Sequence, residues 1–146
     1  MEEHAVENFI LVVENNTSHA QLIASALQRE STRRHLERVT TGEQALNFLR
    51  RRGDYANAPR PHLILLDLNL PECNGTEILA EIKADPSLKR IPIVILTASE
   101  NETDILRSYE LQGNCYVIKA TDLDQLFAII KRIEGFWLGI VTLPTE

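Results

Sequence analysis

Residues 62–75 read HLILLDLNLPECNG, and this stretch decides the fold that the sequence predicts. Leu63–Leu66 is an uninterrupted apolar run, which is typical of a strand buried on both faces of a sheet. A carboxylate, Asp67, stands at the end of this run. Asn74 precedes Glu77 by three residues, a spacing that favours the start of a helix. The stretch therefore predicts a buried strand, an acid at its carboxyl end and a helix that follows.

The same alternation of strand and helix continues along the chain. Apolar, β-branched runs predict strands at residues 9–13, 63–67, 91–97 and 115–119. Residues 35–39, HLERV, predict a weaker strand that could lie at an edge of the sheet. Helical spacing of apolar residues predicts a first helix around Leu22, Ile23, Ala26 and Leu27. A capping box at Thr41 and Gln44 predicts the start of a second helix, and Gly53 predicts its end. Three more helices are predicted over Gly75–Ala84, over about 100–111, and from Asp122 through Ile133.

Five alternating strand–helix units predict an α/β fold, with a parallel sheet covered by helices on both faces. Right-handed crossovers then favour a doubly wound, flavodoxin-like sheet with the strand order 2-1-3-4-5. In such sheets functional groups gather beyond the carboxyl ends of the strands, where the strand order reverses. That point lies between the first and third predicted strands.

Composition narrows the class of protein. The chain has 146 residues, enough for one domain, with 44% hydrophobic residues and a formal charge of -6. A net negative charge argues against nucleic-acid binding and against an anionic membrane surface. Residues 1–8 carry no basic-then-apolar signal, so a cytoplasmic protein is expected. Cys73 and Cys115 belong to no CxxC motif and are expected to be free thiols.

Polar side chains follow four of the predicted strands. They are Glu14, Asn15 and Asn16 after the first strand, Asp67 after the third, Thr97, Ala98 and Ser99 at the fourth, and Lys119 at the fifth. Each one alone is more often a turn residue or a solvated side chain. Together, paired carboxylates beside a neutral oxygen suit Mg²⁺, and an aspartate can accept a phosphoryl group as an acyl phosphate.

This set of residues resembles the receiver domain of two-component response regulators. The resemblance rests on Glu14, on Asp67 with Pro71 and Gly75, on Thr97 with Ala98, and on Lys119 with Tyr116 three residues before it. It covers essentially the whole chain. It implies a signalling protein that a histidine kinase phosphorylates, and not an enzyme.

The resemblance also implies a role for each residue that contacts the phosphoryl group. Asp67 is expected to accept the group, and Lys119 to pair with it. Thr97 is expected to hydrogen-bond a phosphoryl oxygen and to move toward it, while Ala98 leaves room. Tyr116 is expected to swing inward as Thr97 moves, which would be the switch.

A Mg²⁺ site is implied at the same place. Its expected ligands are Asp67, Glu14 through water, the side chain of Asn15 and the backbone carbonyl of Asn69. The family normally has an acid at position 15, and the carboxamide removes one negative charge. A unit charge pair at about 4 Å is worth about 4 kcal/mol at an effective dielectric near 20. Solvation offsets part of this, so Mg²⁺ binding is expected to weaken by roughly one to three decades.

Asn15 leaves two alternatives open. The site is either a slower phosphoacceptor or one in which the missing charge mimics part of metal binding and favours an always-on or unregulated state. Asn15 also supports a pseudo-receiver, a binding module with this fold that is never phosphorylated in use. A second departure is Ala120, where the family usually has a proline after a cis bond. A cis bond before a non-proline residue costs about 2.5–4 kcal/mol, so the Lys119–Ala120 bond is predicted to be trans.

Two further stretches of sequence point to one group within the response regulators. Residues 53–71, GDYANAPRPHLILLDLNLP, and residues 136–144, FWLGIVTLP, are similar to the cyanobacterial phytochrome-associated regulators. Those are single-domain proteins, commonly dimeric, that a light-regulated histidine kinase phosphorylates. A phytochrome-type kinase is therefore the expected partner.

The C-terminal extension, residues 135–146, follows a receiver domain expected over residues 1–134. Its surplus apolar side chains are Phe136, Trp137, Leu138, Ile140, Val141 and Leu143. They either fold back or form an interface, and a homodimer contact through Phe136, Trp137 and Leu138 is favoured. No segment is left for a DNA-binding domain, so output by protein–protein binding is expected.

An enzyme on a similar sheet is the weakest alternative. An aspartate-nucleophile phosphatase needs an acid two residues after Asp67, where this chain has Asn69. A flavin or nucleotide binder needs a turn rich in Gly, Ser or Thr after the first strand, and here that turn begins with Glu14. The basic run at residues 49–53, LRRRG, is favoured as a helix C-terminus over a patch for an anionic partner.

Overall fold

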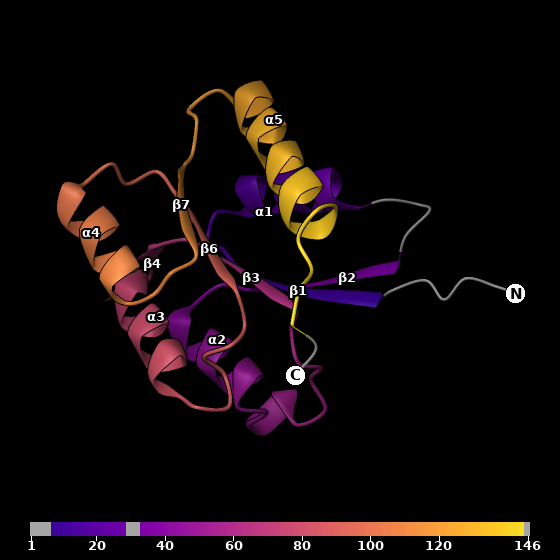
Figure 1. Ribbon diagram of the computed structural model, residues 1–146, viewed down its shortest axis with the longest axis vertical. Helices are drawn as coiled ribbons and strands as arrows, with labels where there is room; N and C mark the ends of the chain where they lie inside the picture. The colour runs from indigo at the N-terminus through magenta and orange to yellow at the C-terminus, as the bar shows by residue number, and fades with distance from the viewer. Residues whose placement is uncertain (1–6, 29–32, 145–146) are drawn as a thin grey trace, which may run out of the picture.

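The computed structural model describes residues 7–28 and 33–144, so the acidic residues 1–6 lie outside the described part. Its main sheet is parallel (Figure 1). The strands are β1 (Glu7–Val13), β2 (Arg33–Val39), β3 (Leu63–Leu66), β6 (Ile93–Thr97) and β7 (Cys115–Ile118). Their order, β2-β1-β3-β6-β7, confirms the predicted order 2-1-3-4-5, with the predicted edge strand at an edge.

Helices cover both faces of this sheet (Figure 1). They are α1 (Thr17–Leu27), α2 (Gly42–Leu49), α3 (Gly75–Ala84), α4 (Glu102–Glu110) and α5 (Leu123–Ile133). α1 and α5 lie together on one face, and α2 and α3 lie on the other. α4 packs beside α3 and β7.

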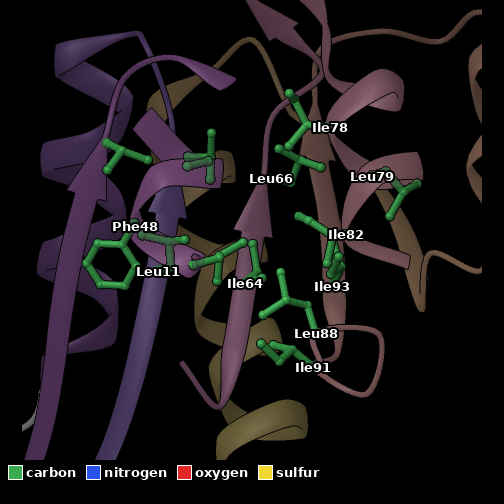
Figure 2. Close-up of a cluster of buried hydrophobic side chains, with 14 of the residues drawn as sticks. Leu11, Phe48, Ile64, Leu66, Ile78, Leu79, Ile82, Leu88, Ile91 and Ile93 are labelled. Atoms are coloured by element: carbon green, nitrogen blue, oxygen red, sulfur yellow. The ribbon is translucent and has the colours of Figure 1, made fainter. Parts of the chain in front are cut away.

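The apolar run at β3 explains the two-sided core. Ile64 and Leu66 belong to the cluster with α2 and α3, which Figure 2 shows. Leu63 and Leu65 point to the opposite face and join the cluster with α1 and α5. Successive side chains of a strand alternate between faces, so a strand covered on both sides must be apolar at every position. Each such side chain contributes about 2 kcal/mol of burial free energy.

Side-chain caps start four of the helices. Thr41 Oγ1 accepts from the backbone N–H of Gln44 at 3.1 Å, as the capping pattern predicts. The reciprocal hydrogen bond of the capping box differs from the standard pattern. Gln44 Oε1 accepts from the N–H of Thr40, at 2.8 Å, and not from that of the capping residue Thr41. Asn74 caps α3, as expected, through the N–H of Thr76. Asn16 and Asn101 cap α1 and α4 in the same way.

Two local features depart from the sequence-based prediction. Gly53 does not stop α2, which ends at Leu49 and is followed by Arg51 in a left-handed conformation with φ 55°. Backbone hydrogen bonds from Arg50 and Arg51 to α2 carbonyls close the helix before Gly53 is reached. A short hairpin, β4 (Asn69–Leu70) with β5 (Cys73–Asn74), was not predicted, since two-residue strands have no periodicity to detect.

The C-terminal extension divides between core and surface. α5 runs directly into a π-helical turn, η2 (Glu134–Leu138). Trp137 and Leu138 pack against the core cluster of α1 and α5. Phe136 and Ile140 remain exposed, at 51% and 75%. Part of the extension therefore folds back, and an apolar part stays on the surface.

Candidate functional site

Backbone hydrogen bonds carry three charged residues to one edge of the sheet. The N–H of Asp67 donates to Val13 O at 3.0 Å, one residue beyond β3. The N–H of Glu14 donates to Val39 O at 3.0 Å, and that of Lys119 to Thr97 O at 2.8 Å. Each residue thus extends the sheet ladder by one step. The predicted gathering of side chains at the carboxyl ends of the strands is present.

Lys119 lies between the two carboxylates. Its Nζ is 2.8 Å from Asp67 Oδ2 and 3.0 Å from Glu14 Oε1. The side chains of Lys119, Asp67 and Glu14 are only 3–5% exposed. Two carboxylates and one ammonium leave an excess negative charge in a buried place, where charge interactions are stronger than in water.

The second oxygen of each carboxylate binds a backbone N–H. Asp67 Oδ1 accepts from Asn69 at 3.0 Å, and Glu14 Oε2 accepts from Asn16 at 3.1 Å. These short-range bonds orient both carboxylates within their own loops. Burial raises the pKa of Glu14, the Asp67 carboxylate raises it further, and Lys119 offsets part of the effect.

The donor set at this edge suits a hard cation. The carboxylates of Asp67 and Glu14 both contact Lys119, and the adjoining loops carry the carboxamide of Asn15 and the backbone carbonyl of Asn69 as further candidate ligands. Oxygen is the ligand that Mg²⁺ prefers. Within residues 7–28 and 33–144, no three His, Cys, Asp or Glu side chains are grouped to hold a metal ion. A cation here would need the neutral oxygens as well as the two carboxylates.

Asn15 is exposed, and its backbone rather than its side chain is anchored. Arg38 donates to the carbonyl oxygens of Glu14, at 2.9 Å, and Asn15, at 3.1 Å. The turn after β1 is therefore held to β2. The exposed Asn15 side chain lies in this turn, one residue after the buried Glu14.

The remaining predicted residues line the neighbouring strands. Thr97 is fully buried at the end of β6, and Ala98 after it is exposed. The hydroxyl of Tyr116 donates to Ser99 O at 3.0 Å. Ser99 Oγ in turn donates to Asp104 Oδ2 on α4 at 2.7 Å. The loop after Thr97 is thus linked to both β7 and α4.

Two simpler predictions are confirmed. None of the peptide bonds in the described residues is cis, so Lys119–Ala120 is trans. Cys73 and Cys115 are free, and burial raises the pKa of both thiols. A raised thiol pKa disfavours the reactive thiolate.

The response regulator receiver domain family matches residues 10–131 of the chain. The chain belongs to this family. Response regulator Rcp1 of Synechocystis sp. is 49% identical to it over 135 residues, which cover 92% of each chain. The receiver-domain match ends within α5, before the C-terminal extension.

Solved receiver structures superpose closely on this one. The crystal structure of the phosphorylated cyanobacterial phytochrome response regulator RcpA is 51% identical, covers 96% of this chain and all of its own, and gives a TM-score of 0.93. The Mn²⁺-bound form of Rcp1 is 48% identical, covers 94% of this chain and 99% of its own, and gives 0.91. RcpA is thus known in a phosphorylated form and Rcp1 in a Mn²⁺-bound form.

The structure adds three neighbours of the candidate site that the sequence did not predict. Arg38 clamps the turn after β1, and Ser99 joins Tyr116 to α4. His19, on the first turn of α1, contacts Lys119 with 2.8 Å between Nδ1 and Nζ. No sequence signal marks Arg38 or His19, because both contact residues that are distant along the chain.

Among the described residues, no helix has the length and apolarity that a membrane span requires.

Proposed function

We propose that this chain is a single-domain response regulator that accepts a phosphoryl group on Asp67 from a histidine kinase. The observation that carries this proposal is the buried Asp67 carboxylate, 2.8 Å from Lys119 and close to the second carboxylate, Glu14. The relationship to Rcp1 over 92% of both chains supports a response regulator role for this chain. The kinase would be of the phytochrome type, by analogy with the phytochrome response regulator RcpA.

In the proposed reaction an oxygen of Asp67 attacks the phosphorus of a phosphohistidine. The new O–P bond forms as the P–N bond breaks, and the imidazole nitrogen keeps the electron pair and takes up a proton. The Lys119 ammonium pairs with the Asp67 carboxylate before the transfer and with the phosphoryl oxygens after it. Asp67 is an acceptor in a signalling event, so the chain itself is not proposed to be an enzyme.

Glu14, Asn15, Asp67 and the Asn69 carbonyl would hold Mg²⁺ in this scheme. The bound ion supplies positive charge that neutralises the incoming phosphoryl group. Lys119 must leave Glu14 to make room for it, because its ammonium now lies 3.0 Å from Glu14 Oε1. The missing acid at position 15 is the reason to expect weak Mg²⁺ binding.

Thr97 and Tyr116 would form the switch. Within the described part of the chain, Thr97 Oγ1 accepts one long hydrogen bond, 3.4 Å, from the N–H of Ser99, so its hydroxyl is available for a phosphoryl oxygen. Movement of Thr97 would shift the loop that follows it, and Tyr116 is hydrogen-bonded to that loop at Ser99 O. Ala98 would leave space for the phosphoryl group. The phosphorylated protein would pass on the signal by binding another protein, with no nucleic acid or membrane involved.

The apolar surface of the C-terminal extension supports a homodimer. Phe136 is 51% exposed and stands edge-on to Trp137, with ring centroids 5.6 Å apart. Leu123 and Ile118, on α5 and β7, are also exposed large hydrophobic side chains. A second copy of the chain would cover this surface, with Phe136, Trp137 and Leu138 at the contact.

A pseudo-receiver is the second candidate, and Asn15 is the observation that favours it. In that case the domain binds its partner without phosphorylation. Acetyl phosphate with Mg²⁺, followed by intact-mass measurement, separates the two candidates. The parent chain should gain one phosphoryl group, Asp67→Asn should gain none, and Asn15→Asp should gain it faster by about tenfold or more.

The variants make each outcome informative. An adduct in Asn15→Asp alone would establish the pseudo-receiver. An adduct that survives in Asp67→Asn would move the acceptor elsewhere. No adduct in any of the three chains would contradict the proposed phosphoacceptor.

A further inference from the structure

His19 lies beside the proposed phosphorylation site but belongs to none of the roles assigned so far. It sits in the first turn of α1, where its backbone N–H donates to the capping oxygen of Asn16 at 2.9 Å. Its imidazole is half-buried, and Nδ1 lies 2.8 Å from Lys119 Nζ. The helix cap uses only the His19 backbone, so the imidazole is free to serve the site.

The contact defines how the imidazole is protonated. A lysine ammonium can only donate hydrogen bonds, so Nδ1 must accept and the ring proton must be on Nε2. Burial lowers the pKa of His19, and the positive charge of Lys119 lowers it further, while Asp67 acts in the opposite direction. His19 is therefore neutral near pH 7, as an acceptor must be.

The imidazole completes the hydrogen bonds of Lys119. The ammonium has three N–H groups, and its three acceptors are Asp67 Oδ2 at 2.8 Å, Glu14 Oε1 at 3.0 Å and His19 Nδ1 at 2.8 Å. His19 is the one neutral acceptor of the three. Unlike the carboxylates, it has no part in the proposed Mg²⁺ site.

We propose that His19 is a positioning residue, whose neutral imidazole holds the Lys119 ammonium beside Asp67 when a divalent cation takes Glu14. This inference rests on the proposed phosphoacceptor function and deepens it. A cation at the site removes Glu14 as an acceptor for Lys119, which leaves Asp67 and His19. The imidazole therefore matters more in the cation-bound site than in the free one.

Two substitutions separate this role from a general structural one. His19→Ala removes the acceptor, and His19→Asn restores one, since the side-chain oxygen of asparagine stands close to where Nδ1 stood. Ser18→Ala, an exposed neighbour in the same turn, is the matched control. We expect Mg²⁺ affinity, measured by titration calorimetry, to fall about tenfold in His19→Ala and to stay near the parent value in the other two.

A measurement that needs neither metal nor phosphoryl group comes first. Nitrogen-15 NMR of the parent chain should show His19 as the Nε2–H tautomer, with a pKa below the ordinary value of 6.5. Lys119→Met should raise that pKa. An Nδ1–H tautomer, or a pKa that ignores Lys119→Met, overturns the contact on which the inference depends.

The rate of acetyl-phosphate labelling completes the test. It should fall with Mg²⁺ affinity in His19→Ala and recover in His19→Asn. Equal Mg²⁺ affinity in the parent and in His19→Ala would overturn the positioning role. If the parent is never labelled, the proposed function fails, and the Mg²⁺ titration and the NMR result still decide the role of His19.

Discussion

At the scale of single residues, backbone geometry places the proposed acceptor. The N–H of Asp67 is bound to Val13, and its carboxylate is bound to Lys119 and to the N–H of Asn69. Gly75, at the start of α3, packs against the same segment. A Cβ on Gly75 would stand 2.8 Å from Asp67 O and 2.7 Å from the Cα of Leu68. The loop that carries the acceptor and the following helix can approach this closely only because residue 75 has no side chain.

Gly75→Ala should therefore destabilise the protein by about 2 kcal/mol, because the added methyl group meets backbone that cannot move aside cheaply. Urea unfolding measures this. Gly135→Ala is the matched control, since a Cβ there meets no atom within 4 Å, and it should change stability by less than about 0.5 kcal/mol. Equal stability of the two variants would contradict the close packing at Gly75.

At the scale of elements, a buried ion pair joins Glu134, the residue before the C-terminal extension, to the edge strand β2. Arg34 Nη1 on β2 lies 2.7 Å from Glu134 Oε2, where η2 begins, and the two side chains are 5% and 2% exposed. Arg34 also donates to the last carbonyl of α1, Leu27 O, at 2.8 Å. Lys131, on α5, adds a partly exposed contact to Glu134 at 3.1 Å. These bonds join β2, α1 and α5 at one end of the molecule.

Glu134→Gln should lower the free energy of unfolding by about 3 kcal/mol, because it leaves the Arg34 guanidinium buried without its opposite charge. Lys131→Gln removes a side chain that is 40% exposed and should cost less than about 1 kcal/mol. Urea unfolding of both variants, and of Glu134→Gln combined with Arg34→Met, checks this. Strictly additive losses in the double variant would show that the pair is not coupled.

At the scale of the whole molecule, two buried cores contrast with a set of exposed hydrophobic side chains. The two cores lie on opposite faces of the sheet and share its strands. The large exposed hydrophobic side chains lie on α4, β7, α5 and the extension, and they are Leu106, Tyr109, Ile118, Leu123, Phe136 and Ile140. We expect these side chains to belong to an interaction surface, because exposed apolar patches mark such sites.

Sedimentation velocity tests whether that surface joins two copies. The parent chain should sediment as a dimer, and Phe136→Asp should weaken the association at least tenfold by placing a charge in an apolar contact. Asn57→Asp adds the same charge on an exposed loop and should leave the dimer intact. A parent chain that stays monomeric at every concentration would contradict the homodimer.

Most of the architecture follows from local sequence patterns. The apolar runs at β1, β3 and β6 and the helical spacings between them predict the element order, and crossover handedness then predicts the strand order. The prediction fails where the signal is short or non-local. Gly53 was a plausible stop for α2, yet Arg51 takes the left-handed conformation two residues earlier.

The sequence by itself determined which residues reach the carboxyl edge of the sheet. Glu14, Asp67 and Lys119 each follow a strand, and parallel strands end at one edge, so their proximity needs no knowledge of side-chain packing. Only the tertiary structure decided what those residues touch. His19 and Lys119, like Arg34 and Glu134, are 100 residues apart in the chain. Such pairs depend on how α1 and α5 pack on the sheet. The periodicity of apolar residues predicts which face of an element is buried, but not which distant side chain that face contacts.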